Sequence, residues 1–266
     1  MKKIFVISII VISFGLSSFA QEGLYAGGHF AYNSTWLLNP QVFDEGAAMD
    51  VDVPFGYYWG FNVGYEFSDQ IGLGLEFNIN TINQKYVGDV QYFVGDDYNS
   101  YTANTRLKTF DIPLLLKVGG DSYFEIGPVF QMVNGATYNR TFDDEDSYVA
   151  GLKIPTGTYK NPSDIIPNYF FENKEDENVQ ETFSKNGFAI AMGFGSDIAL
   201  IEESLFLSIG VRFQYTFTDM EGINGLGEDI ESKYVPEENS AGTNEKERFK
   251  TNPLLGGFKI GIKYKI

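Results

Sequence analysis

Ten charged side chains interrupt segments of alternating apolar residues, and they are the main candidates for chemistry in this chain. Within each segment they stand on the face opposite the large aliphatic and aromatic residues. Five are acids and five are bases: Glu66, Glu76, Asp111, Lys117, Glu125, Asp197, Arg212, Lys259, Lys263 and Lys265. Charges on a shared buried face must be paired and hydrogen-bonded. We therefore expect a structural network of internal salt bridges, and the alternative is a path for protons or ions.

Asp111, Lys117 and Glu125 are the expected core of this network, because they lie on the same face of one predicted hairpin. Lys263 and Lys265 are close to the chain end, and the alternative to a place in the network is that they contact water. The predicted polar network therefore consists of the other eight residues.

No catalytic or metal site is predicted. His29 is the only histidine, and a catalytic pair would need a Ser or Asp partner in a water-accessible position, so we expect a packing or hydrogen-bonding role. The HExxH, GxSxG and P-loop spacings do not occur in the sequence. The chain has no cysteine, and the acidic run 143–146 lacks the glycine and final glutamate of an EF-hand loop. We expect a protein that is not an enzyme and binds no cofactor.

Composition and the first residues narrow the class of protein. The 266-residue chain carries a formal charge of −17, which argues against nucleic-acid binding. Lys2 and Lys3 precede an apolar run over 4–14 and small residues at 18 and 20, which predicts a signal peptide over 1–20 followed by a single domain over 21–266. The alternative, an N-terminal membrane anchor, needs a longer apolar run.

Eight segments alternate between apolar and small or polar residues, and each predicts a strand. They cover 23–33, 55–67, 71–83, the two strands of a hairpin within 104–133, 185–200, 205–217 and 254–266. Short and long connections alternate strictly between them. The short ones are 68–70, 119–121 and 201–204, and the long ones are 34–54, 84–103, 134–184 and 218–253. Short periplasmic turns, long extracellular loops and an even strand count are typical of outer-membrane barrels.

The two faces of the strands favour a membrane barrel over a soluble one. A soluble lipocalin-like barrel has its apolar residues inside and its charges outside. Here the second face is rich in Gly, Ala and Asn, which suit the crowded interior of an eight-stranded barrel. Tyr57, Trp59 and Tyr264 lie near strand ends, as interfacial aromatic residues do. We predict an all-β, eight-stranded antiparallel up-and-down transmembrane β-barrel in the cell outer membrane.

Two prolines interrupt the central hairpin. Pairing Val118 with Ser122 leaves a three-residue loop over 119–121 and places Pro128 opposite Ile112, beside Pro113. Proline removes a ladder hydrogen bond, so a bulge or local distortion is expected in this patch.

The hairpin also carries a family resemblance. The string FDIPLLLK at 110–117, a glycine turn, and YFEIGP at 123–128 resemble the PorT-like outer membrane β-barrel family of Bacteroidetes. The resemblance is specific over about twenty residues. It implies an outer-membrane location and an eight-stranded barrel, and it assigns no function.

The expected function is that of a structural or surface-interaction protein acting through long acidic extracellular loops. Loop 134–184 is longer than a simple connection between strands needs to be. We expect it to fold over the barrel mouth or to contact a partner. Its aromatic residues are Tyr138, Tyr159, Tyr169, Phe170 and Phe171. The expected partners are outer-membrane lipid, lipopolysaccharide and an envelope protein. The alternatives are a narrow porin-like channel for small solutes and a component of a secretion or envelope complex.

Overall fold

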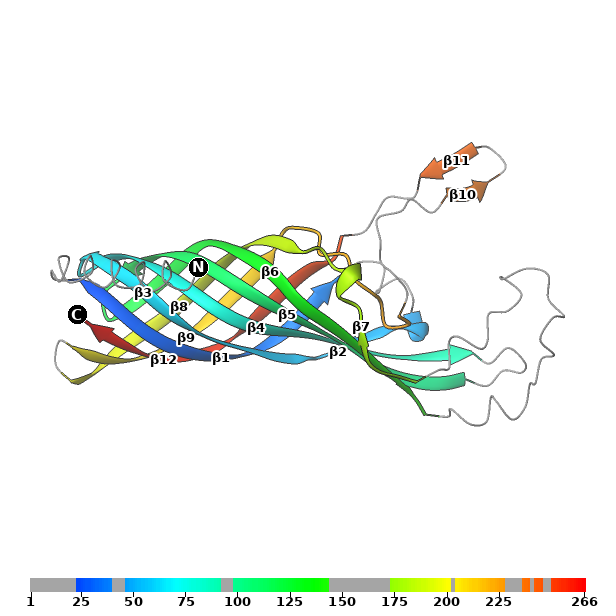
Figure 1. The fold of residues 1–266 in the computed structure, drawn as a ribbon, viewed down its shortest axis with the longest axis horizontal. Coiled ribbons are helices and arrows are strands. Elements are labelled where there is room, and N and C mark those ends of the chain that lie inside the picture. Colours follow the sequence, from blue (N-terminus) through cyan, green and yellow to red (C-terminus); the bar gives the residue numbers. More distant parts are fainter. Residues whose placement is uncertain are drawn as a thin grey trace, which may run out of the picture.

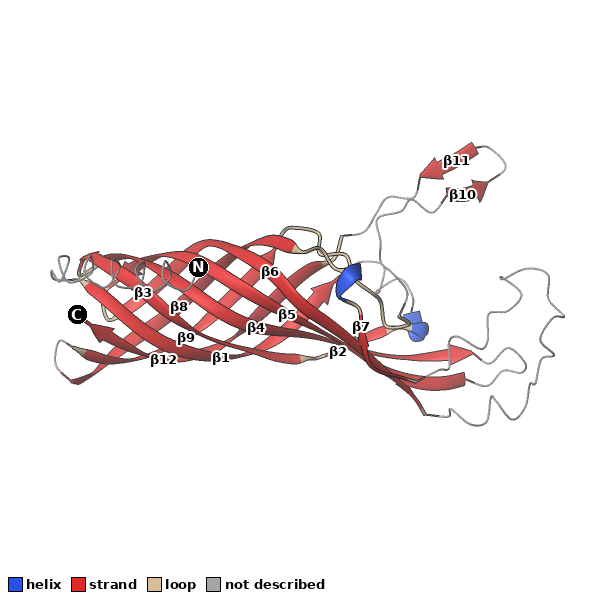
Figure 2. Cartoon of the chain, viewed as in Figure 1, coloured by secondary structure: helices blue, strands red, loops and turns tan. Residues whose placement is uncertain are grey.

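Eight long strands close into one antiparallel barrel (Figures 1 and 2). The computed structural model describes residues 23–39, 46–91, 98–143, 173–201, 204–227, 236–239, 242–245 and 250–266. The predicted signal peptide over 1–20 lies outside these ranges. The barrel strands are β1 (Leu24–Leu38), β3 (Phe55–Ser68), β4 (Ile71–Gln91), β5 (Tyr98–Gly119), β6 (Ser122–Phe142), β8 (Asn186–Ile201), β9 (Leu205–Thr216) and β12 (Asn252–Lys265).

Each barrel strand pairs with the next, and β1 pairs with β12 to complete the ring. The predicted fold class, an eight-stranded antiparallel up-and-down barrel, is confirmed. Short elements complete the described structure: η1 (Gly46–Ala48), β2 (Asp50–Asp52) beside β4, β7 (Lys174–Asn178) beside β6, η3 (Gln180–Thr182), and a separate pair formed by β10 (Pro236–Asn239) and β11 (Gly242–Glu245). No helix in the described part of the chain combines the length and apolarity that crossing a membrane requires.

The tight turns and the chain end lie together at one end of the barrel, the turn end (Figure 1). The Ile266 amide donates to the Leu24 carbonyl at 2.8 Å, and the Gly119 amide donates to the Gln70 carbonyl at 2.7 Å. These bonds tie the last strand to the first and one hairpin turn to its neighbour. The opposite end, where the long connections leave, is called the mouth.

Strands β4, β5 and β6 are longer than predicted and extend past the other strands at the mouth (Figure 1). Residues 84–91, 98–103 and 134–142, expected in loops, are strand. The sequence alternates here too, but with reversed polarity: Thr102, Arg106 and Lys108 are exposed, whereas Ala103 and Leu107 are buried. A prediction that looks for large apolar residues on the outward face therefore places the mouth ends of these strands too close to the apolar segments.

The outward face carries a band of apolar side chains. On β4, β5 and β6 the apolar outward rows run over 71–79, 110–118 and 124–132, nine residues each. Leu114 and Leu116 are each 42% exposed and Ile79 is 45% exposed. Nine to eleven tilted strand residues match the thickness of a bilayer core. Tyr57 pairs with Thr81 at the mouth edge of this apolar band, and Tyr264 lies near the turn end.

A β-bulge marks the level where the long strands leave the apolar band. Lys108 pairs with Gly135 and Thr109 pairs with Val133, so Asn134 is an extra residue on β6. The inserted residue changes which alternate positions of β6 face inward. Beyond it the even-numbered residues Ala136, Tyr138 and Arg140 point inward.

The central hairpin has a different register from the predicted one. Gly119, not Val118, forms the last pair, and its partner is Tyr123. The shift is two residues, so the predicted faces are kept. Gly119 has a φ of +121°, a conformation that favours glycine, and Ser122 instead pairs with Ser196 on β8.

The prolines distort the hairpin without a bulge at their position. Ile112 pairs with Phe130 rather than Pro128, and Pro113 pairs with Val129. The ladder is interrupted between the Pro113 pair and the pair of Leu116 with Ile126, and the register does not shift there. The loss of the proline amides explains this interruption.

Candidate functional site

Four charged side chains from four strands meet in the middle of the barrel and form the central cluster. Arg212 on β9 donates from Nε to Glu125 Oε1 at 2.8 Å and from Nη2 to Glu76 Oε1 at 2.9 Å. Lys259 Nζ on β12 lies 3.2 Å from Glu76 Oε1 and 3.5 Å from Glu125 Oε1. Two acids and two bases balance, and all four residues are buried.

Glycine gives the arginine room to reach across the interior. Arg212 pairs with Gly193 on one side and Gly257 on the other. A Cβ at Gly193 would lie 2.9 Å from Glu125 Oε1. A side chain at position 193 would therefore crowd the carboxylate that Arg212 binds.

A second group of charges, the turn-end cluster, lies closer to the tight turns. Lys117 Nζ lies 2.6 Å from Asp197 Oδ2, and Lys263 Nζ lies 3.0 Å from Glu66 Oε1. Lys263 also contacts Asp197, so the buried Lys263 belongs to the network that the sequence analysis assigned without it. Lys265 binds Glu66 at 3.2 Å with its side chain 34% exposed, between the network and water.

Asp111 belongs to neither cluster. Its Oδ2 accepts hydrogen bonds from Asn80 at 3.1 Å, Gln131 at 3.2 Å and Gln214 at 3.1 Å. The side-chain amides of three other strands thus hold this buried carboxyl group.

The expected core of Asp111, Lys117 and Glu125 is not found, because the three side chains enter three different groups. Lys117 and Glu125 are direct cross-strand partners, yet their charged ends turn to β8 and β9. In a narrow barrel, inward side chains converge on the axis and meet those of distant strands, which hairpin proximity does not predict.

His29 has a hydrogen-bonding role next to the central cluster. Its Nε2 lies 2.8 Å from Asn78 Oδ1 and 3.6 Å from Glu76 Oε2. These partners fit the expected role. In the described ranges, no group of three His, Asp or Glu side chains is placed to hold a metal ion. Of the acidic run 143–146, the structure describes only Asp143.

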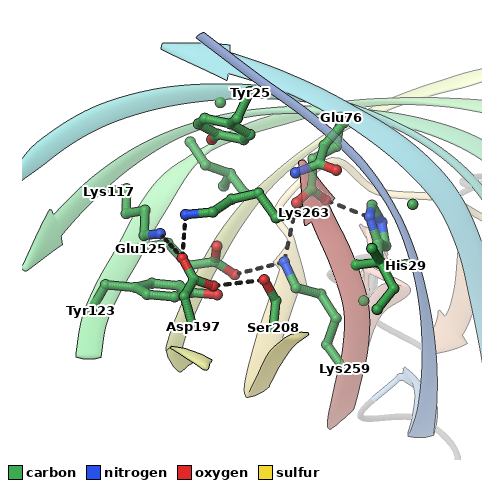
Figure 3. Close-up of a pocket in the computed structure, with 16 residues that line it drawn as sticks. Tyr25, His29, Glu76, Lys117, Tyr123, Glu125, Asp197, Ser208, Lys259 and Lys263 are labelled. Carbon is green, nitrogen blue, oxygen red and sulfur yellow. Dashed lines mark hydrogen bonds and ion pairs between the residues drawn. The ribbon is translucent and has the colours of Figure 1, made fainter. Parts of the chain in front are cut away.

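A cavity of about 40 Å³ is lined by residues of both clusters (Figure 3). Lys117, Asp197 and Lys263 of the turn-end cluster and Glu76, Glu125 and Lys259 of the central cluster all line it. A buried water needs about 10–15 Å³, so the cavity is large enough for on the order of three waters. The charges on its walls suit bridging waters and leave no room for a larger solute.

An apolar cluster fills the barrel interior towards the mouth, and we call it the mouth core. It is formed by Leu37, Met49, Ile82, Tyr86, Tyr101, Ala103, Leu107, Val133, Ala136, Tyr138, Phe142, Val179, Phe183, Met220, Ile223 and Leu255. Most of these side chains come from the inward faces of the long strands. The rest come from β1, β12, the residue between η1 and β2, and the segments just before β8 and just after β9.

The segment 219–227, the mouth loop, is fixed inside the barrel opening. The Tyr138 hydroxyl donates to the Gly225 carbonyl at 2.8 Å, and the Met220 amide donates to the Thr251 carbonyl at 2.9 Å. Gly222 has a φ of +114°, and its amide donates to Thr182 at 3.0 Å. These hydrogen bonds hold the mouth loop in one position, where it plugs the barrel opening.

The sequence analysis missed the mouth core, although a signal for it exists. Apart from Gln84, Thr105 and Arg140, the inward positions of 82–86, 101–107 and 136–142 are apolar, which means that most of the large apolar residues change faces along each long strand. Tyr138, expected in loop 134–184, is a buried strand residue of this core. Tyr159, Tyr169, Phe170 and Phe171 of that loop lie outside the described residues.

Comparison with known proteins finds small outer-membrane barrels at low similarity. Neisserial surface protein A is 9% identical, with 92% of this chain and 97% of that chain covered and a TM-score of 0.34. The outer membrane protein OprG from Pseudomonas aeruginosa is 17% identical, with the same coverage and a TM-score of 0.34. Ail, the attachment invasion locus protein of Yersinia pestis, is 10% identical over 92% of this chain and 100% of that chain, with a TM-score of 0.30.

These similarities are too low to carry an argument about function. No protein-family model and no curated protein matches the chain, so the resemblance to the PorT-like family stays a prediction. The barrel assignment rests on the closed ring of hydrogen-bonded strands in the chain itself.

Proposed function

We propose that this protein is an integral outer-membrane barrel, closed to solutes and without enzymatic activity, that acts as a structural or surface-interaction protein at its mouth. The observation that carries the proposal is the nine-residue apolar band on the outward face of β4, β5 and β6. In water this band would be a large exposed apolar surface, which is rare in a soluble monomer. In a bilayer it is the surface that contacts lipid.

The filled interior supports a closed barrel rather than a porin-like channel. The central cluster and the turn-end cluster cross-link the strands at two levels, and the cavity that residues of both clusters line measures only about 40 Å³. The mouth core closes the third level with packed apolar side chains. A solute would have to break ion pairs and displace the mouth loop to pass.

The surface role is supported by the part of the protein beyond the apolar band. There β4, β5 and β6 carry polar outward residues and extend the sheet, with β2 and β7 along its edges. Long loops held by a rigid scaffold are the usual place for recognition. A role in a secretion or envelope complex stays an alternative that only the family resemblance favours.

Cell fractionation and gel mobility test the membrane part of the proposal. The protein, expressed with its N-terminal segment, should fractionate with the outer membrane and migrate faster on a gel before boiling than after. A soluble monomer without a heat-dependent mobility change would overturn the assignment.

Planar-bilayer recording tests closure separately. The folded protein should show no steady unitary steps. Steps that persist in protein of verified heat-dependent mobility would support the narrow channel instead.

A further inference from the structure

We propose that Asn134 is a site of spontaneous modification, at which the backbone nitrogen of Gly135 converts the side-chain amide into a carboxylate through a cyclic imide. Asn134 is the extra residue of the β6 bulge, and Gly135 follows it on the mouth side of the apolar band. The proposed function is not a premise of this inference, because the reaction needs only water and these two residues.

The reaction replaces an amide nitrogen by an oxygen and involves no oxidation or reduction. The Gly135 nitrogen forms a bond to Asn134 Cγ, the bond from Cγ to Nδ2 breaks, and ammonia leaves with the proton of the Gly135 amide. One water molecule then opens the imide ring. Opening at the side-chain carbonyl gives aspartate, and opening at the backbone carbonyl gives isoaspartate. Either product gives the bulge a negative charge that the encoded sequence does not have.

The local surroundings leave room for this ring. Asn134 is exposed, so water reaches its side chain. Glycine has no Cβ beside the attacking nitrogen. A Cβ built at Gly135 would meet no atom within 4 Å apart from those of its chain neighbours, so no distant part of the protein crowds this position.

The pair also lies in a gap between the two strands that flank β6 on the side away from β5. The last contact with the β8 side is the Val133 amide, which donates to the Lys185 carbonyl at 2.9 Å. The ladder with β7 begins only at Thr137. In the described ranges, neither β7 nor β8 pairs with Asn134 or Gly135. With the bulge interrupting the β5 ladder at the same place, the backbone can move towards the imide more easily than within a continuous ladder.

The Asn–Gly pair in the mouth loop is held by hydrogen bonds at both reacting groups. The sequence contains three such pairs, and this one is Asn224–Gly225. The Gly225 amide donates to Met49 Sδ at 3.4 Å, and Asn224 Oδ1 accepts a hydrogen bond from the Leu226 amide at 2.9 Å. Asn224 is also buried. We therefore expect this pair to react slowly in the folded protein.

The third pair, Asn186–Gly187, is the closest control. Asn186 is exposed, like Asn134. Gly187 is the cross-strand partner of Gln131 inside the continuous ladder between β6 and β8. The two exposed pairs therefore differ in their backbone surroundings, a ladder in one case and a bulge in the other.

Timed incubation of the folded full-length protein in detergent, followed by proteolysis and peptide mass spectrometry, tests the site. Conversion adds the mass difference between an oxygen atom and an NH group, and an isoaspartate-specific methyltransferase labels the isomer that the imide route produces. Incubation in urea is the reference, because unfolding removes the differences in backbone surroundings. The test variant is Gly135→Ala, for which the structure has room. Heat-dependent gel mobility verifies that each folded sample is a barrel.

In the folded protein we expect Asn134 to convert faster than Asn186 and Asn224, and in urea we expect all three to convert at similar rates. Gly135→Ala should slow conversion at Asn134 by roughly tenfold, which is about 1.4 kcal/mol in the activation free energy, and leave Asn186 unchanged.

Three results would overturn the proposal. The first is conversion at Asn134 that is no faster than at Asn186 in the folded protein, or that yields no isoaspartate. The second is a rate at Asn134 that Gly135→Ala does not change. The third is the same order of rates in urea, which would assign the difference to the neighbouring sequence and not to the bulge.

Discussion

Arg212 and Glu76 lie 136 positions apart in the sequence and meet across the barrel interior, with Arg212 Nη2 2.9 Å from Glu76 Oε1. Arg212 binds Glu125 as well, so one guanidinium holds the carboxylates of β4 and β6 to β9. The pair joins strands that are not neighbours in the ring.

Arg212→Met should therefore destabilise the barrel strongly. It leaves two buried carboxylates with Lys259 as their only cation in the cluster, and loss of one partner of a buried pair costs about 3–5 kcal/mol. Urea unfolding in detergent, followed by heat-dependent gel mobility, measures the change in unfolding free energy. Lys85→Met is the control, because its pair with Asp52 is open to solvent, where water and salt screen the attraction, so the substitution should change the unfolding free energy little. Equal losses in the two variants would contradict a central role for Arg212.

Gly74 makes room for the Tyr25 hydroxyl inside the turn end. A Cβ at Gly74 would lie 2.7 Å from Tyr25 Oη but 3.9 Å from Cζ. Gly74→Ala should destabilise the protein, and Tyr25→Phe in the same chain should restore most of the loss. A double-mutant cycle should give a coupling free energy of about 1 kcal/mol. Additive effects would show that the ring is not held against this glycine; Gly120→Ala, whose Cβ meets only Asp69 O at 3.5 Å, is the control.

The mouth loop should be released by a polar substitution in the mouth core. Ile223 is 3% exposed, and Ile223→Asn would bury an amide among apolar side chains. A protease specific for glutamate should then cleave after Glu221, a site protected in the unmodified protein. Gel mobility should show an intact barrel, since both charged clusters are untouched. Fragment masses identify the cleavage, and Thr102→Asn on the exposed outward face is the control. Cleavage of the unmodified protein at the same rate would rule out a fixed loop.

The sequence predicts the barrel well because its outward faces obey one simple rule, large apolar residues at every second position. Strands 55–67 and 71–83 begin where the rule begins, and the structure places them at Phe55–Ser68 and Ile71–Gln91. The ends at the mouth are not predictable from this rule, because the apolar residues change to the inward face there. Ile82 and Leu107 follow the new polarity and are fully buried.

The sequence predicts which face of the strands these residues occupy, but not the groups that they form. All eight network residues point into the barrel, and their parity alone places them there. Which acid meets which base depends on strand stagger across the axis, and a period-two pattern carries no information about it. Lys263 shows the same limit of the sequence pattern. Its position near the chain end suggested contact with water, but closure of the barrel buries its side chain.

Chemical labelling along the outward face of β5 tests the membrane-embedded barrel most directly. The sequence has no cysteine, so single Thr102→Cys, Asn104→Cys, Leu114→Cys and Leu116→Cys variants report one position each. A membrane-impermeant maleimide applied to intact cells and to vesicles with the barrel in either orientation should label positions 102 and 104. Positions 114 and 116 should react only after unfolding in urea. Leu114 and Leu116 are each 42% exposed on the protein itself, so only lipid protects them. Labelling of positions 114 and 116 in the folded protein at the rate of position 102 would contradict the account.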